Sequence, residues 1–152
     1  MKKKLSFLVI VLVGISILIL NFPIIHFPVN MPEKFTGMDY RPKYIPFQTT
    51  NEYSTIISCG RNCVEINYHY ENNDYQLSIL ASEKVSFSSE PIWNKENRVK
   101  ETDYYFMRDP NSQLLAWVDE KRETEFFIEN KGKVLEKETM IKIAQSLNDL
   151  QK

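Results

Sequence analysis

The two cysteines of this 152-residue chain are close enough in sequence to do chemistry together. Cys59 and Cys63 are separated by a Gly-Arg-Asn sequence at 60–62. A disulfide that closes this loop is the favoured interpretation, because glycine and asparagine tolerate the positive φ that a tight loop can require. A thioredoxin-type redox pair is an alternative, although enzymes of that type have two intervening residues. A metal site is a third, but only His69 lies nearby as a further ligand.

No other group of residues forms a catalytic or metal-binding pattern. His69 would need a nucleophile or a carboxylate partner to act as a general base, and an exposed strand histidine is the simpler interpretation. The densest acidic run contains Asp119, Glu120, Glu123 and Glu125. It is typical of a solvated hairpin, and it lacks the turn glycine of a calcium loop. We therefore expect no enzymatic activity, no cofactor and no metal.

Aromatic residues are more numerous than one small core obviously needs, with eight tyrosines and two tryptophans. Those singled out as a possible binding face are Tyr68, Tyr70, Tyr75, Tyr104 and Trp117. One interpretation is that they pack one face of a sheet, with their hydroxyls at the rim. The functional alternative is a concave apolar face that binds a lipid, a peptide or a segment of a partner protein.

The N-terminal segment has the composition of a membrane anchor. Lysines at 2–4 precede the stretch 5–20, which carries no charge. As a helix this stretch spans roughly 24 Å, and its continuation to Ile25 approaches the length of a membrane span. A cleaved secretory signal is the alternative, but no small residue occurs at 21–28. We predict an uncleaved single-pass anchor over 1–25, with the N-terminus cytoplasmic and the rest outside, where thiols tend to oxidise.

The rest of the chain divides into a linker and one domain. Four prolines, at 28, 32, 42 and 46, predict a stiff, extended stalk over 26–47. Residues 48–152 have the length of one extracytoplasmic domain with one core. Three of the nineteen basic residues precede the apolar stretch, so sixteen bases face twenty acids in the exported part. This mildly acidic balance gives the domain no electrostatic reason to bind nucleic acid.

The period of the apolar residues predicts the domain's architecture. The stretches 64–70 and 75–81 alternate around the turn sequence Asn-Asn-Asp at 72–74, which indicates a hairpin. Further strands are predicted at 98–107, 114–118 and 124–128. The last stretch changes to helical spacing, with Met140, Ile141, Ala144 and Leu147 on one face. We predict an α+β fold, an antiparallel and curved sheet with a C-terminal α-helix packed on one face, preceded by one transmembrane helix.

Four segments occur in an order that is familiar from other proteins. They are Pro42-Lys43-Tyr44-Ile45-Pro46-Phe47, the hairpin 64–82, the strand Leu115-Ala116-Trp117 and the closing helix 138–147. Together they resemble the domain of unknown function 4367 family, an extracytoplasmic family of Gram-positive bacteria. The resemblance implies a tethered domain similar to the curved-sheet-plus-helix domains that carry lipoproteins or sense the state of the envelope. It brings no catalytic residues, and the Cys59/Cys63 pair departs from its pattern.

These observations lead to one expected function and two alternatives. We expect a membrane-anchored extracytoplasmic module that is not an enzyme and that binds an envelope protein or lipid ligand, or senses the state of the envelope. Its membrane contact would be the N-terminal helix. The first alternative is a thiol-disulfide redox protein that uses Cys59 and Cys63, and the second is a structural protein of the envelope or spore.

Overall fold

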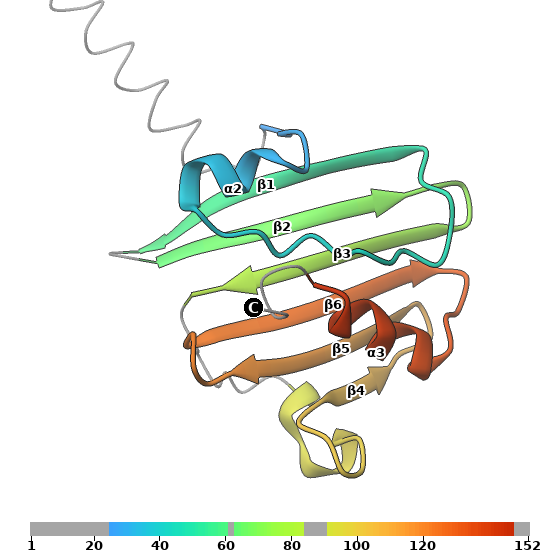
Figure 1. The fold of residues 1–152 in the computed structure, drawn as a ribbon. Helices are drawn as coiled ribbons and strands as arrows, with labels where there is room; N and C mark the ends of the chain where they lie inside the picture. Colours follow the sequence, from blue (N-terminus) through green and yellow to red (C-terminus); the bar gives the residue numbers. More distant parts are fainter. Residues whose placement is uncertain (1–24, 61–62, 84–90, 148–152) are drawn as a thin grey trace, which may run out of the picture.

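The computed structural model describes residues 25–60, 63–83 and 91–147, which form one sheet with helices on it (Figure 1). The strands are β1 (Asn51–Gly60), β2 (Cys63–Glu71), β3 (Tyr75–Ser82), β4 (Tyr105–Arg108), β5 (Ser112–Asp119) and β6 (Thr124–Gly132). The helical elements are α2 (Met31–Thr36), α3 (Lys137–Gln145) and the short 3-10 helices η1 (Pro91–Trp93) and η2 (Lys95–Asn97). All strand pairs are antiparallel in the order β1-β2-β3-β6-β5-β4. The predicted antiparallel sheet with a C-terminal helix is confirmed.

The β2–β3 hairpin forms where the alternation predicts it. The Oδ1 atom of Asn72 accepts hydrogen bonds of 2.9 Å from the backbone N–H groups of Asp74 and Tyr75. This Asx-type turn sets a register in which Tyr68 pairs with Ile79. Since side chains alternate between the two faces of a strand, the register puts the apolar residues of both strands on one face, apart from Leu80, which pairs with Asn67 on the other.

The core lies on that one face, under two covering pieces. The first is α3, which buries Met140 and Ala144 of the predicted stripe and also Ile143, while Ile141 is half-buried. The second is the coil 38–47, which crosses the same face beside α3 (Figure 1). Together they shield the apolar residues of the central strands from water, which is the main favourable term in folding.

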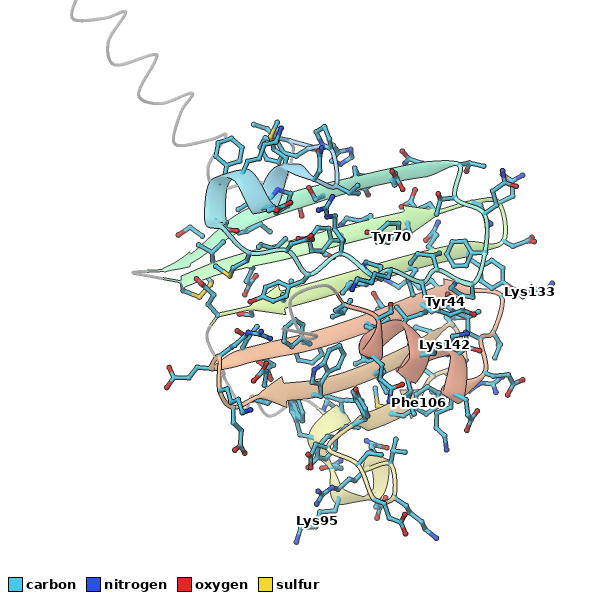
Figure 2. All side chains as sticks on the ribbon, viewed as in Figure 1. Tyr44, Tyr70, Lys95, Phe106, Lys133 and Lys142 are labelled. Atoms are coloured by element: carbon cyan, nitrogen blue, oxygen red, sulfur yellow. A yellow bond between two sulfur atoms is a disulfide. The ribbon has the colours of Figure 1, made fainter. Side chains whose placement is uncertain are left out.

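The two covering pieces are bonded to each other. The N–H of Lys43 donates to the carbonyl oxygen of Ser146 at 3.0 Å, and the N–H of Tyr44 donates to the Ser146 hydroxyl at 3.2 Å. The ammonium of Lys142 lies 4.1 Å from the centre of the Tyr44 ring, in a cation–π contact (Figure 2). The position of the coil therefore depends on the position of α3.

Residues 26–47 differ from the extended stalk that the prolines predict. Phe27 forms a bridge with Ser54 on β1 through two backbone hydrogen bonds of 2.8 and 2.7 Å, and Tyr40 is buried in the core. Pro32 stands at the start of α2, where its missing N–H costs nothing, and Gly37 ends that helix with a φ of 75°. The prolines shape a helix and turns instead of a rod, because the apolar residues between them are buried against the sheet.

Two strands also differ from the pattern. The sequence predicts no strand at β1, and it predicts a strand over 98–107 where β4 spans only Tyr105–Arg108. The N–H of Thr102 donates to the carbonyl of Val99 at 3.2 Å, and Glu101 has a φ of 59°, so a tight turn interrupts the expected strand. The predicted long strand is therefore a turn followed by a short edge strand.

The predicted anchor over 1–25 lies outside the described residues, except for Ile25. Across 25–60, 63–83 and 91–147, no helix combines the length and the apolar character that crossing a membrane requires.

Candidate functional site

The aromatic residues singled out as a binding face come together in the structure, but they are part of the core. Tyr68, Tyr70 and Trp117 are each no more than 6% exposed. The ring of Trp117 stacks on Phe126 with 4.8 Å between the centroids. The hydroxyl of Tyr68 accepts a hydrogen bond of 3.4 Å from the N–H of Tyr40, on the coil that covers it.

The other two aromatic candidates are half-buried at the borders of the same core. Tyr75 stacks on Phe47 at 4.7 Å, and Tyr104 meets Trp117 edge-on at 5.5 Å. These contacts tie the coil and the β4 end of the molecule to the sheet. The five residues therefore offer no open aromatic face. They pack one face of the sheet, which is the first of the two interpretations given above.

A groove remains open beside Tyr70, at the border between the covering coil and β1. It has a volume of about 540 Å³. Its apolar lining includes Val29, Ile45 and Phe47, and the ring of Tyr70 contributes from β2. Two charged residues, Arg41 and Glu52, also line it.

Carboxylates dominate the charge around the groove. Arg41 donates from Nε and Nη2 to the two oxygens of Asp39, both at 2.7 Å, and from Nη2 to Glu33 at 2.9 Å. The hydrogen bond to Asp39 raises the pKa of Arg41 above its ordinary value, so the guanidinium stays charged and engaged. Glu52 adds a third carboxylate. Burial raises the pKa of Tyr70, so its hydroxyl stays neutral.

The opposite face of the sheet carries a stack of three rings. Tyr53 of β1 lies between His26 and His69, with centroid distances of 3.9 and 4.5 Å. His69 is therefore half-buried, not the isolated exposed histidine that the sequence predicts. Burial lowers the pKa of His69, while the charge of Glu71 acts to raise it and that of His26 to lower it. Charging His69 in the folded state is thus unfavourable.

His69 is expected to make the domain less stable in acid. Because its pKa is lower in the folded than in the unfolded chain, the unfolded chain takes up the proton first. The stability contributed by neutral His69 is present above the unfolded pKa of about 6.5 and falls as the pH drops below it. Urea unfolding of the full chain in detergent, at several pH values, should show this loss, and His69→Gln should reduce it. Equal pH dependence in the two proteins would contradict the assignment.

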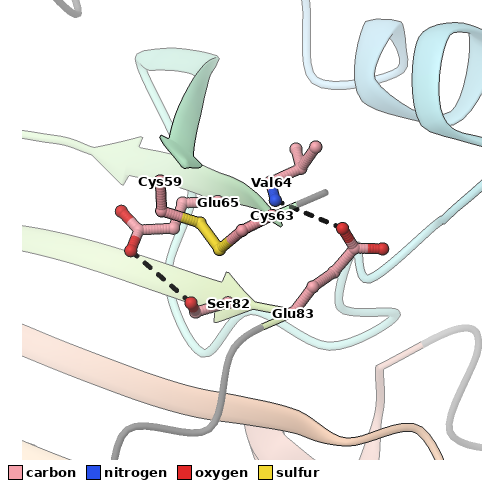
Figure 3. Close-up of a disulfide and its surroundings, with 6 residues drawn as sticks. All are labelled: Cys59, Cys63, Val64, Glu65, Ser82 and Glu83. Atoms are coloured by element: carbon pink, nitrogen blue, oxygen red, sulfur yellow. Dashed lines mark hydrogen bonds between the residues drawn. A yellow bond between two sulfur atoms is a disulfide. The ribbon is translucent and has the colours of Figure 1, made fainter. Parts of the chain in front are cut away.

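Cys59 and Cys63 form the predicted disulfide (Figure 3). Their Cα atoms are 5.1 Å apart, within the usual range for a disulfide. The bond joins the end of β1 to the start of β2, and Cys63 is buried. It holds the β1–β2 hairpin together at its turn, whereas Asn51 and Glu71 pair at the open end of the two strands.

The surroundings of the disulfide disfavour redox chemistry. Glu65 and Glu83 lie on either side of it, held by a 3.5 Å hydrogen bond from the Ser82 hydroxyl and a 3.2 Å bond from the N–H of Val64 (Figure 3). Reactive thiolates are stabilised by cations or helix N-termini, whereas carboxylates oppose them. Within the described ranges, no group of three or more His, Cys, Asp and Glu side chains could hold a metal ion.

Sequence reasoning did not find the groove, because it assigned residues 26–47 to a stalk. The available signal was the charged pair of Asp39 and Arg41 inside a segment that also carries Val29, Ile45 and Phe47. In comparisons with protein families, with characterised proteins and with solved structures, nothing matched this chain.

Proposed function

We propose that the chain is a membrane-anchored extracytoplasmic module that binds an extended segment of an envelope protein and performs no catalysis. The observation that carries this proposal is the groove of about 540 Å³ beside Tyr70. Its volume is within the range of roughly 300–1,000 Å³ that is typical of ligand clefts. Its walls are built from the packed coil and the sheet, so a ligand meets a surface that is already formed.

The charge around the groove decides the kind of partner. Arg41 is paired with Glu33 and Asp39, and Glu52 lines the same groove, so three carboxylates accompany one guanidinium there. A segment with basic side chains next to apolar ones complements this surface, because the carboxylates attract the cations and the apolar walls take the rest. β1 is also an edge strand, bridged on its outer side by Phe27 at Ser54, and extended segments commonly bind along sheet edges.

The location is supported by two observations. The uncharged stretch 5–20 behind lysines 2–4 has the character of a single-pass anchor. The disulfide between Cys59 and Cys63 fits a domain outside the cytoplasm, where such bonds persist.

Photo-crosslinking from the groove tests the binding. Gln48 is exposed at the groove, and replacing it with benzoylphenylalanine in the full chain, in native membranes, places a reactive group there. Irradiation is expected to give adducts with a protein partner. Glu52→Lys in the same chain should lower their yield about fivefold, as expected for the loss of about 1 kcal/mol of ionic attraction. Gel mobility and mass spectrometry would measure yield and identity.

The matched control carries the same reactive residue at Lys131, which is exposed on the opposite face of the sheet. Adducts that appear from Gln48 but not from Lys131, and that depend on Glu52, support the proposal. Adducts with lipid alone would show that the groove binds an apolar ligand instead. Equal adducts from both positions, or none, would overturn the groove as a binding site.

A further inference from the structure

Exposed apolar side chains gather where the chain enters the domain. Of the three exposed large hydrophobic residues in the described ranges, Phe35 is 69% exposed and Ile25 is 38% exposed. The third, Val134, is 49% exposed and lies in the loop before α3. The ring of Phe27 is half-buried and lies 6.2 Å from that of Phe35. Ile25, Phe27 and Phe35 together are called the entry patch below.

Phe35 is exposed on a well-fixed helical turn. α2 packs beside β1 (Figure 1), and Pro32 is buried on its inner side. The hydroxyl of Thr36 donates to the carbonyl of Pro32 at 2.8 Å, and the N–H of Gly37 donates to the carbonyl of Glu33 at 2.9 Å. These bonds close the turn that points Phe35 away from the domain. Together with the nearby ring of Phe27, Phe35 forms an exposed apolar surface, and burying such a surface in an apolar environment is favourable.

The sequence leaves almost no linker between the expected anchor and the entry patch. The apolar segment extends to Ile25, whereas Phe27 is already bonded to Ser54 on β1. Since a residue spans at most about 3.5 Å, His26 can separate the end of the segment from the folded domain by only a few ångströms. Phe35 lies beside Phe27, so it must be close to the membrane surface if the segment crosses the membrane.

We propose that the entry patch rests on the lipid bilayer, with the ring of Phe35 in the headgroup region. This inference rests on the membrane anchoring proposed above, and it identifies lipid as the partner of this surface. Lys34 is exposed next to Phe35, while the neighbouring Glu33 is paired with Arg41. An aromatic residue beside an exposed lysine suits a bilayer that contains anionic phospholipid. The domain would then sit directly on the membrane, with the groove close to its surface.

Fluorescence quenching by brominated lipid tests the contact. The full chain is reconstituted into phosphatidylcholine–phosphatidylglycerol vesicles that carry bromine near the headgroup end of the acyl chains. Phe35→Trp adds an indole at the patch, and Val134→Trp adds one at the other strongly exposed position. After the signal of the unsubstituted chain, which contains Trp93 and Trp117, is subtracted, quenching of Trp at 35 should be at least about twofold stronger than at 134.

A flotation measurement on the same vesicles separates the two proposals. Vesicles that carry the chain to the top of a gradient, together with stronger quenching at position 35, support the entry patch. Flotation with equal quenching at positions 35 and 134 overturns the entry patch and leaves the anchor standing. A chain that does not float overturns the anchor, and the entry patch with it. Both substitutions are at exposed positions, so neither should disturb folding.

Discussion

Replacing Gln113 with leucine is expected to lower the free energy of unfolding by about 3 kcal/mol. Gln113 is buried on β5, and its side chain makes three hydrogen bonds. Its Nε2 donates to the carbonyl of Leu135 at 2.7 Å, and its Oε1 accepts from the N–H of Leu135 at 2.7 Å and from Asn130 Nδ2 at 3.0 Å. Leucine has a similar volume but leaves these buried groups without partners, which is more costly than losing the bonds alone.

Urea denaturation of the full chain in detergent, followed by circular dichroism, would measure this loss. The matched control is Gln76→Leu, because Gln76 is exposed on β3. Its effect should stay within about 0.5 kcal/mol of the original chain. A Gln113→Leu protein as stable as the Gln76→Leu protein would show that the hydrogen bonds around Leu135 contribute little.

The bonds of Gln113 also matter for the groove. They fix Leu135, which is two residues before α3 begins. α3 in turn holds the coil through the hydrogen bonds from Lys43 and Tyr44 to Ser146. The coil forms one side of the groove, so the position of the candidate binding site depends on a polar network at the opposite end of the helix.

The parts of the fold that could be predicted are those that local patterns decide. β2 and β3 alternate cleanly around an Asn-Asn-Asp turn, and α3 has one continuous apolar stripe. Period and turn chemistry are enough in such cases. β1 could not be predicted in this way. It is an edge strand whose early residues are mostly polar, and pairing with β2 and a bridge to Phe27 make it a strand.

The candidate site could not be predicted because it depends on long-range packing. Prolines at 28, 32, 42 and 46 are equally compatible with an extended linker and with a folded coil. Burial of Tyr40 against the sheet decides between them, and sequence patterns do not show this contact. The aromatic residues illustrate the same limit: the residue types suggest one binding face, whereas the covering coil buries Tyr68 and Trp117 and leaves Tyr70 at the border of the groove.

Phe126→Ala is expected to destabilise the chain by about 4 kcal/mol, more than the other changes considered. Phe126 is fully buried on β6, where Trp117 stacks on it and Tyr40 meets it edge-on at 5.0 Å. Truncation removes a large buried ring and leaves a cavity that two neighbouring rings cannot fill without moving. Since Tyr40 belongs to the coil, detachment of the coil should accompany the loss of stability.

The matched control is the same substitution at Phe35, which is 69% exposed. In detergent, Phe35→Ala should change the free energy of unfolding by less than about 0.5 kcal/mol. If the aromatic face of the sheet were instead an open binding surface, Phe126→Ala would cost as little as Phe35→Ala and would impair only binding. A large difference between the two variants, measured by the same urea denaturation, therefore assigns the aromatic face to the core.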